Sequence, residues 1–360
     1  MILELLLSFS GFCFALVLSY LIMPFIIKSA TEARMVTTDA HKPGKPEIAE
    51  PGGIGALLAF LGAFSFIILI TVILYYIMLD SSFNTIIPFL NNPDFQALIS
   101  KLYENKVYFL GALLTVVIAG LLGFLDDIFG ISLKWRHKIL LGFLPAVPLM
   151  ILSVGVPDIS IPFIGVVPLG LWYGLIIVPL ETNFGFNSVN MLAGYNGLET
   201  GMGIVSFSTV FLAAFYVNDP TIMVFSATML GALAILFYFN KYPAKTLIGD
   251  SGTLFIGTAL IVTIILANME KLALGIFLLY FINFVMFFVY LYKGEKKKLA
   301  DINIDSNGKI YLRPSCPYTV YWFLPFYKNI TEKENVYILI GLQAVICLIT
   351  LLLFVATTHV

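Results

Sequence analysis

Long apolar segments alternate with short polar ones along the whole chain, and this alternation predicts a membrane protein. A transmembrane helix needs about 20 predominantly apolar residues, and ten segments qualify on that scale. The predicted spans are residues 4–28, 53–79, 107–125, 138–155, 163–180, 202–217, 222–239, 247–267, 272–292 and 335–357. The expected fold is an all-α polytopic membrane protein of about ten transmembrane helices, forming a single domain over residues 1–360.

Composition supports the same class of protein. Hydrophobic residues make up 60% of the chain and charged residues 11%, whereas a soluble domain carries about a quarter charged residues. The net charge of −1 argues against bulk attraction to nucleic acid. Cys13, Cys316 and Cys347 lie far apart without CxxC spacing, so neither a disulfide framework nor a zinc site is predicted. The first apolar segment lacks a preceding basic segment and a cleavage signal, which indicates a retained span rather than a signal peptide.

Lysine and arginine are distributed unevenly between the loops, and this asymmetry orients the predicted spans. All but three of the 20 Lys and Arg residues fall on the side that holds the loops after odd-numbered spans; the exceptions are Lys101, Lys106 and Lys271. Cytoplasmic loops are enriched in these residues. The loops after odd-numbered spans are therefore predicted to be cytoplasmic, with both termini outside.

The segment 187–201 is the most unusual polar stretch, with three asparagines, one glutamate and three glycines between two apolar segments. It is predicted as a loop. Polar backbone at the edge of a membrane span is costly unless it lines a wet cavity. Amide and carboxylate oxygens suit Mg²⁺, and glycines allow a ligand to approach the backbone closely. A surface loop rich in turn-forming residues is the alternative.

Further polar clusters fall on the same predicted side. Residues 39–53 follow the first span, Asp126 and Asp127 end the third, residues 134–138 lead into the fourth, and residues 249–252 begin the eighth. Paired acids bind a divalent cation, or raise one another's pKa so that one serves as a base. A solvated helix end is the alternative for them, although acids at a helix C-terminus oppose the helix dipole. The 249–252 segment either caps its helix or presents a carboxylate to Mg²⁺ and backbone N–H groups to a phosphate.

Together these clusters offer acids and amides for one metal ion and basic groups for phosphate oxygens. Such groups are suited to phosphoryl transfer, in which catalysis is mostly positioning and charge neutralisation. Of the histidines, His41 is interpreted as a solvated loop residue and His359 as inert. His137 suits phosphate binding or structural hydrogen bonding, because its basic neighbours discourage protonation. Since the site lies at the bilayer edge, a lipid phosphate attacking a nucleotide diphosphate is the natural hypothesis.

At these motifs the chain resembles the polyprenyl-phosphate N-acetylhexosamine-1-phosphate transferase family, and within it the eukaryotic and archaeal branch that uses UDP-N-acetylglucosamine and dolichyl phosphate. The matching stretches are residues 123–127, 135–138, 187–199 and 242–250. The resemblance implies ten transmembrane helices and dependence on Mg²⁺, with Mn²⁺ as a substitute. It also implies transfer of N-acetylglucosamine-1-phosphate to a polyprenyl phosphate with release of UMP, the first lipid-linked step of N-glycan assembly.

The resemblance also implies roles for the matched residues. Asn190 and Asp250 would hold the metal ion, and Lys138 would contact diphosphate oxygens. Asp126 and Asp127 would flank the attacking lipid phosphate; which of them acts as a base, if either does, stays open. The implied substrate-binding residues are Glu50 near the sugar, Gly194 and Asn196 at the uracil, and Asn187, Glu199, Arg136 and His137.

One segment departs from the family pattern. Relatives carry an Arg/His-rich segment in the loop after the ninth span, where residues 293–298 of this chain are rich in lysine. Lysine lacks the bidentate fork of arginine, so the donor sugar stays open between N-acetylglucosamine and another UDP-amino sugar. A basic run attracted to anionic headgroups is the alternative. Residues 305–313 resemble a small hairpin with an Asn-Gly turn, and residues 293–333 are predicted to form a cytoplasmic loop that shapes the sugar pocket.

The predicted partners are a UDP-amino sugar, a polyprenyl phosphate and the membrane, with a homodimer left open. A transporter of a phosphorylated solute is the alternative from another class, because paired intramembrane acids and broken helices also occur there. Transporters generally place their polar site near the bilayer midplane, often with repeat symmetry between halves. Here the clusters lie at loop edges on one side and no repeat is visible, which favours the enzyme.

Overall fold

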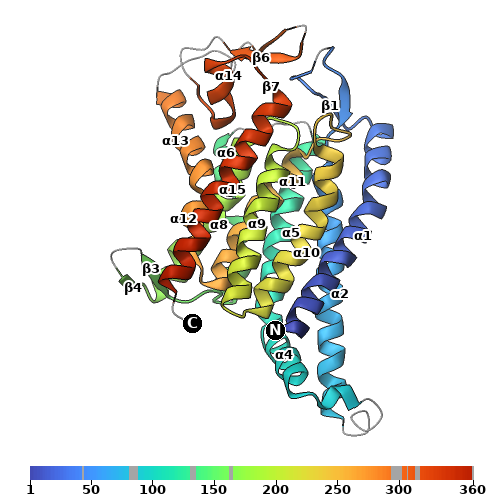
Figure 1. Cartoon of the computed structure of the whole chain (residues 1–360), viewed down its shortest axis with the longest axis vertical. Coiled ribbons are helices and arrows are strands. Elements are labelled where there is room, and N and C mark those ends of the chain that lie inside the picture. Colours follow the sequence, from blue (N-terminus) through green and yellow to red (C-terminus); the bar gives the residue numbers. More distant parts are fainter. Residues whose placement is uncertain are drawn as a thin grey trace.

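The computed structural model describes residues 1–42, 44–80, 88–129, 135–161, 165–292, 302–305, 307–312 and 317–358. Within these ranges the protein is mostly helical, and the long helices run side by side along the long axis of the molecule (Figure 1). Seven of them are long and apolar enough to cross a membrane: α1 (Ile2–Glu32), α2 (Gly52–Leu79), α5 (Lys106–Phe129), α9 (Leu198–Tyr216), α10 (Pro220–Asn240), α11 (Gly249–Ala267) and α15 (Glu332–Thr357). The bent pair α12 (Glu270–Ile276) and α13 (Leu278–Tyr292) meets the same test jointly, with a 60° bend. The chain is a polytopic membrane protein.

The α11 helix forms the centre of the bundle. Nearly all of its side chains are buried, and it packs against α2, α5, α8 (Val178–Leu192) and α9. Glycines make this close packing feasible: a Cβ at Gly123 of α5 would clash with the backbone of Asp250, and one at Gly53 of α2 would clash with Gly252. Small residues at such crossings are typical of helices that associate in membranes. They bring the ends of α2 and α5 against the first turn of α11.

The predicted span 138–155 is wrong as a single helix. The α6 helix (Trp135–Leu141) ends early and is followed by a 3₁₀ turn, η2 (Leu144–Ala146), and by the short α7 (Val147–Ile151). Pro145 and Pro148 lie in this stretch. Proline lacks the N–H that a continuous helix needs and clashes with the preceding turn, so the helix is interrupted.

The predicted span 163–180 is also wrong. β3 (Asp158–Ile161) and β4 (Gly165–Pro168) pair antiparallel, with Asp158 opposite Pro168, and helical structure follows only as the π-helical turn η3 (Tyr173–Ile177) and α8. The α8 helix runs on to Leu192, well beyond residue 180, where the predicted span ends. Asn187 and Asn190 therefore lie within α8 rather than in the predicted loop, and the non-helical connection to α9 is limited to residues 193–197.

The other eight predicted spans coincide with the long helices to within a few residues, the span 272–292 matching the α12–α13 pair. The described part of the chain also contains seven short strands, of which the sequence predicted only a hairpin near residues 305–313. Besides β3 and β4, these are β1 (Val36–Thr38) paired with β2 (Glu47–Ala49), and a three-stranded sheet of β5 (Ile302–Ile304), β6 (Lys309–Leu312) and β7 (Ile330–Thr331). β5 and β6 pair antiparallel around the Asn-Gly turn, where Gly308 has a φ of +73°.

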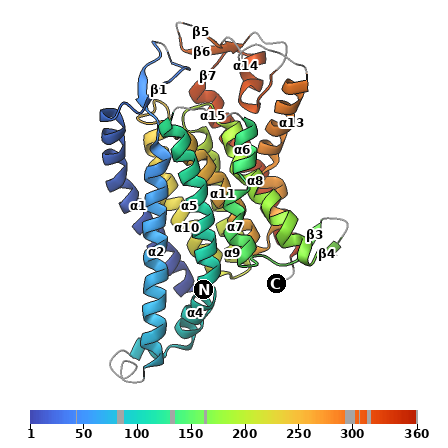
Figure 2. The same ribbon diagram turned by 180° about the vertical axis from the view of Figure 1, so that it is seen from behind.

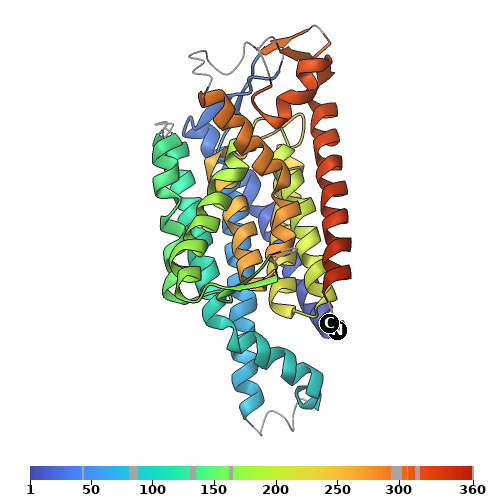
Figure 3. The same ribbon diagram turned by 90° about the vertical axis from the view of Figure 1, so that its left-hand side faces the viewer.

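The two ends of the bundle differ in character. The β1–β2 hairpin, the β5–β6–β7 sheet, η4 (Val320–Trp322) and α14 (Phe323–Tyr327) cover one end (Figure 2). Both chain termini, η1 (Pro88–Asn91), α4 (Pro93–Glu104) and the β3–β4 hairpin lie toward the other (Figure 3). The polar loops singled out by the sequence thus gather at the sheet-bearing end of the bundle.

Candidate active site

Four residues predicted as catalytic or metal-binding meet at the sheet-bearing end. Lys138 on α6 forms ion pairs with Asp126 on α5 (Nζ to Oδ2, 3.0 Å) and with Asp250 in the first turn of α11. The carboxamide of Asn190 on α8 donates to Asp250 and, over 2.9 Å, to the hydroxyl of Thr253. Segments more than 100 residues apart in sequence therefore converge on one polar cluster, which we call the Asp250 cluster.

Asp127 lies beside this cluster with a distinct set of contacts. Its two carboxylate oxygens accept hydrogen bonds from the backbone N–H groups of Asp250 (2.7 Å) and Ser251 (3.0 Å). The first N–H groups of a helix have no partner within the helix, and a carboxylate there is favoured by the helix dipole. Gly249 permits this approach, because a Cβ would lie 2.5 Å from Asp127 Oδ2 and the residue has a φ of +66°. Asp127 therefore caps α11 and orients Asp250.

Two cavities meet at the Asp250 cluster. A polar cavity of about 260 Å³ contains in its wall Glu50, Gly194, Asn196, Glu199 and Asp250, all predicted site residues. An apolar groove of about 290 Å³ runs between α6, α8 and α13, lined by Trp135, Phe143, Leu180, Phe184, Phe284, Phe287 and Phe288.

Asn190 belongs to both walls, and Lys138 of the groove is paired with Asp250 of the polar cavity. Asn187 lies along the groove, where its amide donates to Asn183, and does not line the polar cavity. The groove is thus lined mainly by aromatic side chains, and the Lys138 ammonium lies at the end that meets the Asp250 cluster.

The connection 193–197 is held by side chains from three different helices. Gly194 N–H donates to Glu199 (2.7 Å), Asn196 N–H to Glu332 (2.7 Å), and Gly197 N–H to Asn240 (3.1 Å). Buried backbone donors need such partners. Gly194 has no space for a side chain, because a Cβ would come within 2.5 Å of the Tyr321 ring. Glu199, Glu332 and Asn240 therefore hold the backbone of this loop in place.

Glu50 and His41, which lie outside the membrane-spanning helices, both have shifted pKa values. Burial, and then the nearby carboxylates of Asp250 and Asp126, raise the pKa of Glu50. The interpretation of His41 as a solvated residue is wrong: it lines the cavity, edge-on to Tyr195 at 4.8 Å between ring centroids. Burial, and then Lys42, lower the pKa of His41 from 6.5 to about 4. No local sequence signal marked it, because its burial depends on the loop 193–197.

This lowered pKa predicts a pH effect on stability. The unfolded chain binds a proton at His41 below pH 6.5 and the folded protein only below about pH 4, so the stability contribution of neutral His41 is lost as pH falls through this window. Thermal unfolding in detergent between pH 4 and 8 measures it. Wild type should lose more stability than His41→Gln from pH 6.5 to 4, with equal slopes above pH 7; equal slopes throughout would contradict the prediction.

Several predicted residues are not brought to the cluster. Arg136 and His137 are exposed on α6 and line neither cavity, and the Arg136 guanidinium lies over the Trp135 ring at 5.4 Å. The lysine-rich segment 293–298 lies outside the described residues. The prediction that this segment contributes to sugar recognition therefore stays a prediction.

The donors of the Asp250 cluster fit a magnesium ion. In the described part of the chain no three His, Cys, Asp or Glu side chains converge as a ready metal cage. Mg²⁺, however, is commonly bound through one or two carboxylates together with substrate phosphates, and Asp250 and Asn190 supply one carboxylate and one amide. Around them the carboxyl groups of Asp126, Asp127 and Glu50 outnumber the single ammonium of Lys138, so a divalent cation would offset excess negative charge.

Comparison with known proteins assigns the chain that carries this site to a family. Residues 109–268, which contain Asp126, Lys138, Asn190 and Asp250, match glycosyl transferase family 4. The chain belongs to this family, and the resemblance drawn from the motifs is confirmed.

Individual relatives extend the match over most of the chain. A Saccharomyces cerevisiae protein named UDP-N-acetylglucosamine–dolichyl-phosphate N-acetylglucosaminephosphotransferase is 30% identical over 81% of this chain and 69% of its own length. A Saccharolobus solfataricus protein that carries this name as a provisional assignment is 32% identical over 345 residues, 94% of each chain. The phospho-N-acetylmuramoyl-pentapeptide-transferase of Enterococcus hirae is 32% identical over 47% of this chain and 54% of its own.

Proposed function

We propose that this protein transfers N-acetylglucosamine-1-phosphate from UDP-N-acetylglucosamine to a dolichyl-type polyprenyl phosphate and releases UMP. The observation that carries the proposal is the junction of the polar cavity and the apolar groove at Asn190, beside the Lys138–Asp250 ion pair. A nucleotide sugar requires polar partners, whereas a polyprenyl chain requires an apolar channel that ends at a charged group. The names of the yeast and archaeal relatives support this pair of substrates.

The reaction joins the two substrates at phosphorus. An oxygen of the lipid phosphate attacks the sugar-bearing phosphorus of the donor, a new P–O bond forms, and the bond to UMP breaks with UMP as leaving group. Lys138, at the charged end of the groove, is placed to neutralise phosphate oxygens as they approach. Asp126 holds the Lys138 ammonium, and Asp127 fixes the turn that carries Asp250. When bound by Asp250 and Asn190, Mg²⁺ would supply charge neutralisation on the diphosphate.

The proposal includes a topology of ten crossings with a cytoplasmic active site. The interrupted α6–η2–α7 segment and the continuous η3–α8 segment would add two crossings to the seven long helices and the α12–α13 pair. An even number of crossings agrees with the two termini at one end of the bundle (Figure 3). Lys101 and Lys106 lie toward that same end, on α4 and α5, and the positive-inside rule favours the opposite end as cytoplasmic.

Turnover by the purified full-length protein tests the proposal. In detergent with Mg²⁺, radiolabelled UDP-N-acetylglucosamine and dolichyl phosphate, we expect equal amounts of UMP and labelled lipid, and none without the lipid or with EDTA. UDP-N-acetylgalactosamine in parallel tests the alternative of another amino-sugar donor. Uptake of a labelled phosphorylated solute by proteoliposomes without UMP release would contradict the transferase and support the transporter.

A further inference from the structure

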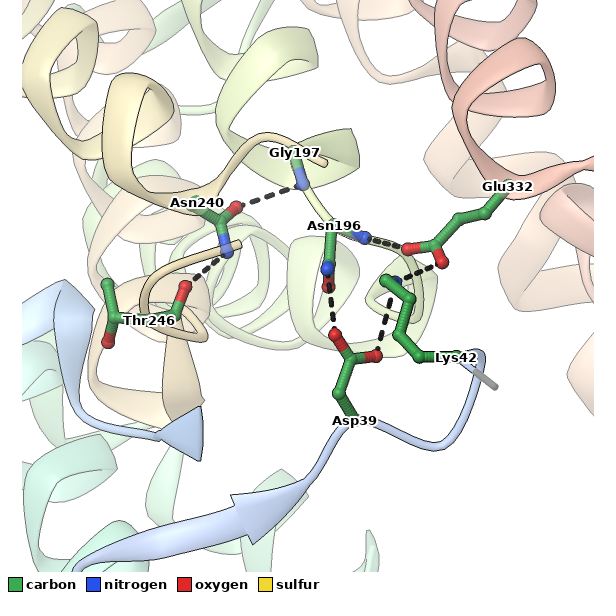
Figure 4. Close-up of polar contacts among 7 residues, drawn as sticks. All are labelled: Asp39, Lys42, Asn196, Gly197, Asn240, Thr246 and Glu332. Atoms are coloured by element: carbon green, nitrogen blue, oxygen red, sulfur yellow. Dashed lines mark hydrogen bonds and ion pairs between the residues drawn. The ribbon is translucent and has the colours of Figure 1, made fainter. Parts of the chain in front are cut away.

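A buried ion network lies behind the loop 193–197 and belongs to none of the predicted site residues except Asn196. Glu332, the first residue of α15, accepts from Asn196 N–H through Oε1 and pairs with Lys42 through Oε2. Asp39 pairs with Lys42 (3.2 Å) and accepts from the Asn196 carboxamide (2.9 Å). Figure 4 shows these groups converging from the β1–β2 hairpin, the loop 193–197 and the start of α15. We call Asp39, Lys42 and Glu332 the loop clamp.

The burial of the clamp shows that these contacts are part of the folded interior. Asp39, Lys42, Asn196 and Glu332 are each at most 7% exposed. Taking charges out of water is unfavourable unless they are paired and hydrogen-bonded, and here both acids have an ammonium and an amide donor. The Lys42 ammonium also lies 4.7 Å from the centre of the Tyr242 ring, which ties in the connection between α10 and α11.

The loop that the clamp holds has little support of its own. It is not helical, and the backbone N–H groups of Gly194, Asn196 and Gly197 all donate to side chains of other segments. Gly194, Tyr195 and Asn196 form part of the wall of the polar cavity. The shape of that wall therefore depends on side chains of other segments, of which Asp39, Glu199 and Asn240 themselves line the cavity whereas Lys42 and Glu332 do not. The clamp supplies two of the contacts to Asn196.

We propose that Asp39, Lys42 and Glu332 are positioning residues that set the nucleotide affinity of the polar cavity by holding Asn196 and its neighbours in their binding shape. The inference rests on the proposed function, in which this cavity receives the nucleotide. Under this proposal the first residue of α15, Glu332, influences nucleotide binding through Asn196, although Glu332 does not line the cavity. Asp39, Lys42 and Glu332 do not line the groove and make no ion pair with the Asp250 cluster. Removing a clamp residue should therefore weaken nucleotide binding and leave the rate of the chemical step unchanged.

The kinetic test compares Lys42→Met, Glu332→Ala and Lys42→Met/Glu332→Gln with wild type. We expect Lys42→Met to raise the KM for UDP-N-acetylglucosamine by about tenfold, the loss expected for a hydrogen-bonded charge. Its kcat and its KM for dolichyl phosphate should stay close to wild type. The double variant should have a lower KM than Lys42→Met, because removing the second charge relieves the repulsion between Asp39 and Glu332 that the first substitution leaves. Lys333→Met, an exposed neighbour on α15, is the matched control and should behave as wild type.

Hydrogen–deuterium exchange gives a readout that does not depend on turnover. In Glu332→Ala the Asn196 N–H loses its acceptor, so exchange in residues 193–197 should become faster than in wild type and Lys333→Met. Unchanged exchange, or a fall in kcat with unchanged KM for the nucleotide sugar, would overturn the clamp. If wild type releases no UMP, the proposed function fails by itself, and the exchange experiment still decides whether the clamp holds the loop.

Discussion

Replacing Asp250 by asparagine is expected to abolish turnover while leaving the protein folded. The variant keeps the size of the side chain and a carbonyl oxygen, but it removes the one carboxylate that contacts both Lys138 and Asn190. Loss of a preorganised charged group from a transition state that develops charge lowers kcat by about a thousandfold. Stability should not fall, because Asp126, Asp127 and Glu50 keep the cluster rich in carboxyl groups after one charge is gone.

The measurement is UMP release together with thermal unfolding in detergent. Wild type should be stabilised by Mg²⁺ with UMP, since a ligand that binds the folded state raises its stability, and Asp250→Asn should lose that increase. Asp158→Asn, an exposed acid on β3 at the far end of the bundle, is the control for the same chemical change. Wild-type kcat in Asp250→Asn would exclude Asp250 from the metal site.

Most of the helical bundle could be predicted because span length is a property of the local sequence. Long apolar runs such as α1, α2 and α15 need no tertiary information to be recognised. The stretch 158–180 could not be predicted on that criterion, because the short apolar segments in it fit a strand as well as a helix. Its prolines and glycines marked breaks, and β-branched residues between them formed a hairpin instead.

Candidate site residues could be recognised in the sequence where a polar residue stands next to long apolar segments. The family resemblance implied that Asn190 and Asp250 share a metal ion, and the structure brings their side chains together although Asn190 lies in a helix. The loop clamp could not be predicted in this way. Lys42 and Glu332 are 290 residues apart, and an acid in the first turn of a helix, as Glu332 is, ordinarily indicates only a favourable helix dipole.

The second prediction with a large effect concerns replacement of Asp127 by asparagine. The family resemblance implies that Asp127 contacts the lipid phosphate, whereas its hydrogen bonds show it at the start of α11. If it flanks the lipid phosphate, as the resemblance implies, Asp127→Asn should reduce activity and leave stability unchanged. If it caps α11, as its hydrogen bonds to Asp250 and Ser251 indicate, stability and activity should fall together. The asparagine amide would face one of these N–H groups as a second donor, and a buried donor without an acceptor lowers the free energy of unfolding by about 1–3 kcal/mol.

We expect the second result, and comparison with Asp250→Asn makes it decisive. Both variants remove one carboxylate from the same end of the bundle, so a change in net charge affects them equally. Only Asp127→Asn removes an acceptor from the first turn of α11, and it should therefore show a lower melting temperature and a kcat reduced through displacement of Asp250. A normal melting temperature with lost turnover in Asp127→Asn would instead assign this carboxylate to the chemistry of the lipid phosphate. In that case both aspartates would act on the lipid phosphate. The capping contact instead gives them separate roles, because Asp126 pairs with the Lys138 ammonium and Asp127 caps the helix that carries Asp250, the proposed metal ligand.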